Sequence, residues 1–192
     1  PCKHGAFSKW KKKQGDAVIL PEAASHVLET GVKALRNNEE ARELLQGDEQ
    51  ATWQRDVEGL PGIQARPDVW LPGGCERSLF ASVSVDLKTT SDFRGGGDWH
   101  RVIAKYRYHV QAAMVRLASG VEDSAHVLIF VEKPRPNRTA VVWLSERWIE
   151  IGTQIALEQL ERLSNCYRSG NWSRSYATVS EPPAWIEREV SK

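Results

Sequence analysis

The sequence predicts an α/β domain in which a central mixed β-sheet is flanked by helices. Three observations indicate this class: about five short strand-like segments, two long segments with apolar residues at helical spacing, and a length that suits one hydrophobic core. A chain of 192 residues is too short for two comfortable cores, so we expect residues 1–192 to form one domain. Because the basic opening begins abruptly, we also expect this domain to lack a native N-terminal segment.

A small helical region is expected first. Apolar residues between positions 27 and 35 recur at helical spacing, and Asn38 provides a capping-type start for a second helix that ends near Leu45.

A hairpin is expected next, because two strand-like segments, Gln50 to Arg55 and Ile63 to Leu71, are joined across a turn at residues 59–62. The second of these strands contains Asp68, and we expect it to pair with the strand Val83 to Lys88.

The second half of the chain alternates helices and strands. A long helix is predicted from about Asp98 to Leu117, after a run of three glycines. Two strands follow, His126 to Val131 and Thr139 to Leu144, and a final helix covers roughly Glu146 to Tyr167. The sheet is therefore expected to have about five strands.

Composition excludes several classes of protein. With 26 Lys and Arg against 25 Asp and Glu, any binding of nucleic acid must come from local clusters of charge, such as the lysines between positions 9 and 13. No apolar run of 18 residues appears, and no short apolar segment has the flanks of a signal peptide, so we expect a cytoplasmic protein without a membrane partner. Three distant cysteines indicate neither a disulfide framework nor a zinc site.

The most informative segment is the strand around Asp86, which alternates apolar and polar residues. Side chains alternate faces along a strand, so Asp86 and Lys88 share one face and lie about 6 to 7 Å apart. Asp68 can converge on them from the neighbouring strand. Two carboxylates could share one or two Mg²⁺ ions, with the backbone carbonyl of Leu87 as a further oxygen ligand.

These groups meet the requirements of phosphodiester cleavage, which are a cation, an activated water and a positive group that orients the water. The alternative is a surface salt bridge between Asp86 and Lys88, because Asp-x-Lys also occurs by chance.

The sequence resembles the PD-(D/E)XK nuclease superfamily, and more narrowly the exonuclease VIII (RecE-type) nucleases of phages and prophages. The segments that carry this resemblance are Glu49-Gln50 with Trp53, Ala65-Arg66-Pro67-Asp68, Val85-Asp86-Leu87-Lys88-Thr89-Thr90, Tyr108-His109-Val110-Gln111-Ala112-Ala113, Gly170-Asn171-Trp172 and Pro183-Ala184-Trp185.

The resemblance implies a restriction-endonuclease-like core and a Mg²⁺-dependent exonuclease, with Mn²⁺ as a substitute ion. Such an enzyme degrades one strand of duplex DNA from an end, 5′ to 3′, and leaves single-stranded tails for recombination. It also implies a ring-shaped homo-oligomer, a trimer or tetramer, and a single-strand annealing protein as a possible partner in a bacterial cytoplasm.

By the same resemblance, Asp68, Asp86 and the carbonyl of Leu87 are metal ligands, Lys88 positions the water, and Gln111 contacts the scissile region. Glu49 is a further acidic ligand or, equally well, a solvated carboxylate. Where the family often has a tyrosine four residues after the glutamine, this chain has Val115, so that role is lost or passes to Tyr108. The candidate DNA contacts are Arg66, Thr89, Arg94, Arg107 and Tyr108.

Two other functions remain open at this stage. One is a structure-specific or site-specific endonuclease on the same core, and the other is an inert protein that binds DNA ends during recombination. Digestion of linear DNA but not of closed circles favours the exonuclease, whereas salt-sensitive binding without cleavage favours the inert protein. An iron-sulfur nuclease is disfavoured, because such a cluster normally needs four cysteines and this chain has three.

Overall fold

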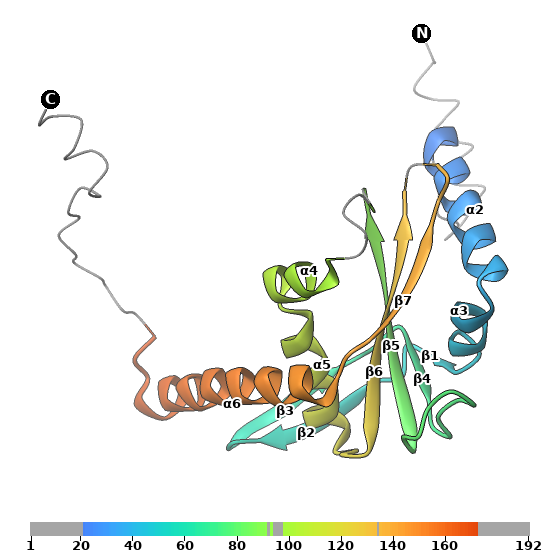
Figure 1. Cartoon of the computed structure of the whole chain (residues 1–192). Coiled ribbons are helices and arrows are strands. Elements are labelled where there is room, and N and C mark those ends of the chain that lie inside the picture. Colours follow the sequence, from blue (N-terminus) through green and yellow to red (C-terminus); the bar gives the residue numbers. More distant parts are fainter. Residues whose placement is uncertain (1–20, 92, 94–97, 134, 173–192) are drawn as a thin grey trace, which may run out of the picture.

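The computed structural model describes residues 21–91, 93, 98–133 and 135–172. Figure 1 shows a twisted sheet at the centre, with helices α2 and α3 along one side and α4 and α5 on the other, while α6 extends away from the sheet. This arrangement confirms the predicted α/β class with a mixed sheet flanked by helices. In the part of the chain that the structure describes, no helix combines the length and apolar character needed to cross a bilayer.

The main sheet has five strands in the order β1-β4-β5-β6-β7. The central strands β5 and β6 pair in parallel, and all other neighbours are antiparallel. A connection through helices joins β5 to β6, as parallel pairing requires. The strands are β1 (Asp48–Glu49), β4 (Val69–Leu71), β5 (Ser82–Thr90), β6 (Ser124–Glu132) and β7 (Thr139–Trp143).

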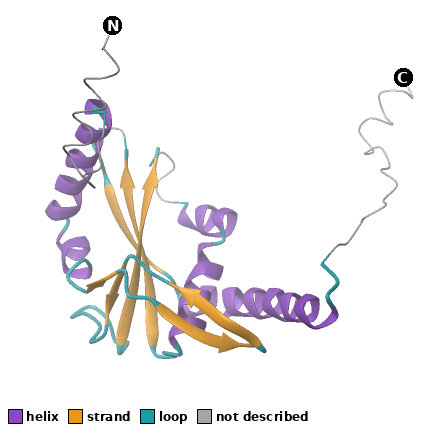
Figure 2. Cartoon of the chain, turned by 180° about the vertical axis from the view of Figure 1, so that it is seen from behind, coloured by secondary structure: helices purple, strands orange, loops and turns teal. Residues whose placement is uncertain are grey.

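The predicted hairpin is present, but it forms a separate two-stranded sheet of β2 (Trp53–Val57) and β3 (Leu60–Ala65). The hairpin packs mainly against α5, and Figures 1 and 2 both show it extending towards α6. The predicted strand Ile63 to Leu71 was therefore wrong as one continuous element. The chain breaks at residues 66–68, where Pro67 has no N–H to extend a strand ladder, and Asp68 lies in this break just before β4.

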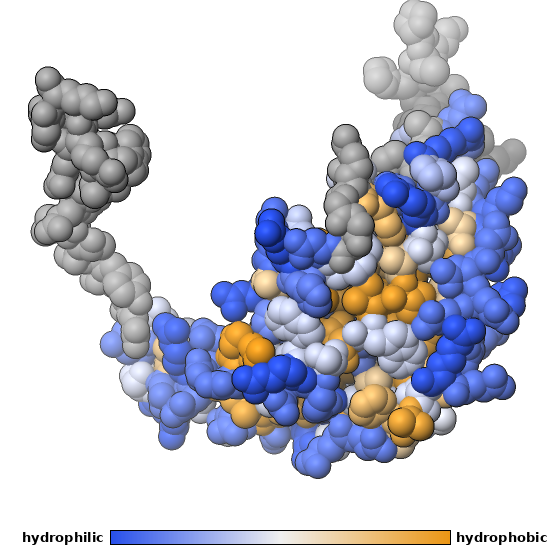
Figure 3. Space-filling view, in the orientation of Figure 1, coloured by the Kyte–Doolittle hydropathy of each residue, from blue (hydrophilic) through white to orange (hydrophobic). Residues whose placement is uncertain are grey.

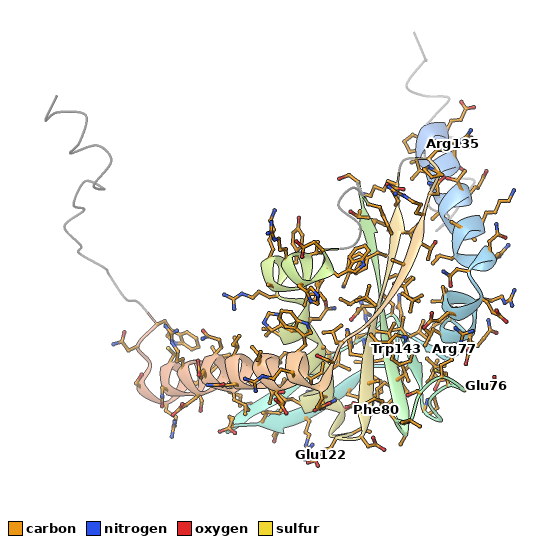
Figure 4. All side chains as sticks on the ribbon, in the orientation of Figure 1. Glu76, Arg77, Phe80, Glu122, Arg135 and Trp143 are labelled. Atoms are coloured by element: carbon orange, nitrogen blue, oxygen red, sulfur yellow. The ribbon has the colours of Figure 1, made fainter. Side chains whose placement is uncertain are left out.

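One face of the main sheet packs against α2 (Glu22–Asn37) and α3 (Glu39–Leu44). Asn38 begins α3 as predicted, because its side-chain oxygen accepts a hydrogen bond from the backbone N–H of Ala41 at 2.9 Å. The carboxylate of Glu40 accepts from the indole N–H of Trp143 on β7, at 2.7 Å. Arg77, in the loop before β5, lies 3.7 Å from the same carboxylate, and Figure 4 labels both Arg77 and Trp143 near α3.

The other face packs against α4 (Trp99–Tyr106), α5 (Tyr108–Ser119) and the start of α6 (Glu146–Ser169). The long helix predicted from Asp98 is broken at Arg107, which adopts the left-handed conformation with φ of 59°. Helices α5 and α6 cross closely at Gly152, where an added Cβ would meet the backbone carbonyl of His109. The two faces have separate cores, made on the α3 side by Ala41, Leu44, Val83, Val85, Val127 and Ile129, and on the α5 side by Ile103, Ala112, Leu128, Phe130, Leu144 and Ile149.

Candidate active site

Two aspartates meet where β4 begins, Asp86 on β5 and Asp68 in the break just before β4. Val69 pairs with Val85 across the antiparallel strands, so the next position outward places Asp68 opposite Asp86. Because β4 begins only at Val69, the edge of β5 is open from this point onward. The carboxylate of Asp68 covers part of that edge, with Oδ2 accepting a hydrogen bond of 2.7 Å from the backbone N–H of Leu87.

The backbone carbonyl of Leu87 faces the same edge. In an extended strand the N–H and C=O of one residue point to the same side, and the N–H of Leu87 points to Asp68. The structure therefore brings the two carboxylates and this carbonyl to one place, as the sequence predicts.

Asp86 is almost fully buried, with 3% of its surface exposed, and a residue of α5 binds its Oδ1 atom. The side-chain amide of Gln111 donates to Oδ1 at 3.0 Å. The amide oxygen of Gln111 accepts a hydrogen bond of 3.0 Å from the ammonium of Lys88, which itself lies 3.8 Å from Oδ1. Gln111 thus bridges the carboxylate and the ammonium, and the three side chains form one connected group.

His126 on β6 is a site residue that the sequence analysis missed. Its register partner on β5 is Ser84, and its Nε2 atom lies 3.1 Å from Oδ2 of Asp86. The two atoms are close but are not aligned as a hydrogen bond, and neither has another hydrogen-bond partner. The other ring nitrogen, Nδ1, lies 2.7 Å from the hydroxyl of Ser84, which also donates to the carbonyl of Ala125.

The signal for His126 was available in the sequence. A histidine inside a strand that is otherwise apolar must find a polar partner when it is buried, although the sequence does not say which neighbouring strand supplies that partner.

The surroundings of Asp86 favour its charged form. Burial raises the pKa of this carboxyl, but the interactions with His126, the charge of Lys88 and the hydrogen bond from Gln111 outweigh burial, so its pKa lies below the ordinary value. Asp86 is therefore ionised at neutral pH and ready to bind a cation.

Tyr108 forms the outer wall beside Lys88, whose ammonium lies 4.8 Å from the centre of the phenol ring. Burial raises the pKa of Tyr108, and the neighbouring Tyr106 and Asp86 raise it further. The phenol therefore stays neutral at physiological pH. The break at Arg107 turns the chain just before Tyr108, so that α5 presents Gln111 to the strands.

The remaining predicted residues are less closely placed. Glu49 is exposed and pairs with Val69, whose side chain belongs to the α3 side of the sheet, so the register places Glu49 on the face opposite Asp86. Thr89 is exposed near the end of β5. Arg66 and Arg107 are exposed in the breaks before β4 and α5. Arg94 and the lysines at 9–13 lie outside the described residues.

These oxygen ligands suit a divalent cation such as Mg²⁺. Among the described residues no group of three or more His, Cys, Asp or Glu side chains could hold a metal ion. Mg²⁺, however, is commonly bound by only one or two carboxylates and keeps several of its waters. Asp68, Asp86 and the Leu87 carbonyl match that pattern, and Oδ2 of Asp86 is a buried atom without a hydrogen bond.

An aspartate just before β4, a second on β5, a lysine two residues after the second, and a mixed sheet flanked by helices are the features of a PD-(D/E)XK nuclease core. Residues 6–178 match the profile of the family described as "PDDEXK-like domain of unknown function (DUF3799)". The chain therefore belongs to this PDDEXK-like family, which confirms the predicted superfamily. Nucleases of this superfamily generally use divalent metal ions.

Comparison with solved structures supports the same fold. The crystal structure of a protein from Eubacterium rectale named "Putative exonuclease" aligns with a TM-score of 0.62 at 14% sequence identity, covering 96% of this chain and 73% of that one. The crystal structure of SSO0001 aligns with a TM-score of 0.37 at 17% identity, covering 79% of this chain and 68% of that one, which is too distant to carry an argument. No curated protein matches the sequence.

Proposed function

We propose that the chain is a Mg²⁺-dependent exodeoxyribonuclease that degrades one strand of linear duplex DNA, 5′ to 3′, and leaves single-stranded tails for recombination. The observation that carries the proposal is the connected group of Asp86, Lys88 and Gln111, with Asp68 across the strand edge, in a PDDEXK-like domain. The name of the Eubacterium rectale protein favours an exonuclease over an endonuclease.

The proposed roles follow from these contacts. Asp68, Asp86 and the Leu87 carbonyl would hold Mg²⁺, or Mn²⁺ in its place, and the bound ion would stabilise the negative charge that develops on the phosphate. The ammonium of Lys88 orients the attacking water, and it is itself held by Gln111 and by the ring of Tyr108. Gln111 restricts the motion of both charged groups, so that they lie ready for the reaction.

The wider setting is part of the same proposal. The DNA contacts near the cut come from Arg66, Thr89, Arg94, Arg107 and Tyr108, while Glu49 lies on the opposite face of the sheet. A ring-shaped trimer or tetramer surrounds the DNA, a single-strand annealing protein receives the product, and the protein acts in the cytoplasm of a bacterium that carries the phage or prophage.

The test is digestion of linear duplex labelled at its 5′ or 3′ ends, beside covalently closed circles, in Mg²⁺ or EDTA. Mg²⁺-dependent loss of linear DNA alone, released first as 5′-terminal nucleotides and abolished in Lys88→Ala, is the expected result. Cleavage of closed circles would identify an endonuclease instead. Binding of DNA ends without any cleavage would identify the inert end-binding protein.

A further inference from the structure

A cavity of about 470 Å³ lies next to the candidate active site, where β5 ends beyond Lys88. We call it the basic-aromatic hollow. Its walls come from the end of β5, from α4 and from the start of α5, and Figure 1 shows α4 beside the ends of β5 and β6. The residues that matter for the argument are Thr89, Arg101, Lys105, Tyr106, Tyr108 and Lys133.

The charged residues in the described part of the hollow's lining are all of one sign. Three of the described lining residues, Arg101, Lys105 and Lys133, are cationic, and no Asp or Glu is among them. Arg101 pairs with Asp98 at 2.9 Å, but both side chains are exposed, and an exposed pair of this kind is easily exchanged for another anion. In the space-filling view of Figure 3, hydrophilic residues cover most of the visible surface, that of α4 included, and a hydrophobic patch is exposed over the central strands. The cationic lining of the hollow favours a phosphate backbone.

Two aromatic rings in the hollow form a short stack. The rings of Tyr106 and Tyr108 lie 5.7 Å apart at an interplanar angle of 23°. Tyr108 is half-buried and is fixed by its contacts with Lys88 and Phe130, whereas Tyr106 is 58% exposed. An exposed tyrosine alone would need no explanation. A ring stacked on a fixed partner, beside cations and next to a candidate nuclease site, has the features of a platform for a nucleic-acid base.

We propose that the basic-aromatic hollow binds a single-stranded segment of the DNA substrate, with one base stacked on Tyr106 and adjacent phosphates bound by Lys105 and Lys133. A base within a duplex is already stacked on both sides, so only an unpaired base can use this platform. This inference rests on the proposed function, because the hollow is continuous with the candidate site through Tyr108. It implies that the end of the duplex is opened beside the cut.

The first experiment is equilibrium binding of a fluorescent single-stranded oligonucleotide in EDTA, followed by anisotropy. Tyr106→Ala is expected to weaken binding about 5- to 150-fold, the range for loss of one stacked base, while Tyr106→Phe keeps the ring and binds as the wild type does. Tyr167→Ala is the matched control, because Tyr167 is an equally exposed tyrosine on the distant helix α6. Wild-type affinity in Tyr106→Ala would overturn the proposal.

A second experiment separates stacking from a general loss of affinity. A series of oligonucleotides is used, each with one abasic position. If a base stacks on Tyr106, one abasic position weakens wild-type binding but causes no further loss in Tyr106→Ala. Equal losses in both proteins at every position would refute stacking.

The phosphate contacts have their own readout in the salt dependence of binding. The slope of log K against log salt is negative. Lys105→Ala and Lys133→Ala are each expected to make it less steep, by about 0.7. Lys33→Ala, an exposed lysine of α2 on the other side of the sheet, should leave the slope unchanged. Slopes that do not change in the first two variants would contradict the phosphate contacts.

Failure of this inference is distinct from failure of the proposed function. Mg²⁺-dependent cleavage together with binding that does not depend on Tyr106 would refute the single-strand site and support the proposed nuclease activity. Binding that depends on Tyr106, without any cleavage, would refute the nuclease activity and support the single-strand site.

Discussion

Gln111→Leu tests whether the connected group at the candidate site is as tightly coupled as its distances indicate. The substitution keeps the approximate volume of the side chain and removes both of its hydrogen bonds, to Asp86 and from Lys88, each of 3.0 Å. A hydrogen bond to a charged group contributes about 1.5–3 kcal/mol, so the two together contribute about 3–6 kcal/mol at most.

Part of this loss should be recovered, because Lys88 and Asp86 are already 3.8 Å apart and can close to a direct ion pair. Both side chains are well shielded from solvent, with exposed fractions of 16% and 4%, so the pair is not a simple surface salt bridge. We therefore expect Gln111→Leu to lower the free energy of unfolding by about 2–4 kcal/mol.

The assay is urea denaturation at neutral pH, with a check that the slope of the transition is unchanged. Gln154→Leu is the matched control, because Gln154 donates one hydrogen bond to Glu158 on the exposed face of α6. Its substitution should change stability by less than about 0.5 kcal/mol. If Gln111→Leu were as mild as this control and also cut DNA at the wild-type rate, the coupling inferred from the geometry would be refuted.

Three further outcomes are expected. Hydrogen bonds from Arg138 lower the pKa of Glu132 from 4.5 to about 2, so the stability from this carboxylate is present above about pH 4.5 and is lost as pH falls towards 2. Melting curves should therefore show a shallower loss of stability in acid for Glu132→Gln, and an unchanged acid slope would contradict this. Gly152→Ala should destabilise the fold by about 1–3 kcal/mol or more, because its Cβ would meet the carbonyl of His109. His126→Asn should raise the Mg²⁺ concentration needed for half-maximal cleavage and weaken Ca²⁺ binding measured by calorimetry, whereas unchanged values for both would leave the histidine a purely structural role.

Much of this site could be predicted because strand alternation is a strong local rule. The spacing of Asp86 and Lys88 fixes their common face without reference to the rest of the fold. The sequence analysis also placed Asp68 beside them. It predicted too long a strand around Asp68, because Pro67 interrupts the chain between β3 and β4.

Other features had no local signal. The break at Arg107 is marked by neither glycine nor proline, and a left-handed conformation is locally unfavourable for arginine, so the sequence around it does not predict the break. Strand β1 has two residues, Asp48 and Glu49, too few for any periodic pattern. The sequence analysis therefore placed no strand there and counted the hairpin strand Gln50 to Arg55 in the main sheet instead. His126 does carry a local signal, as a polar residue in an apolar strand, but its contact with Asp86 depends on the parallel register of β5 and β6, which is a non-local property.

The central claim is that Asp86 is part of a metal-dependent nuclease site, and the most direct measurement is DNA cleavage by Asp86→Asn. The substitution keeps the shape of the side chain and removes its charge. We predict Mg²⁺-dependent cleavage by the wild type, none in EDTA, and a rate lowered at least about 100-fold in a folded Asp86→Asn protein. Cleavage in EDTA, or a wild-type rate in Asp86→Asn, would contradict the account.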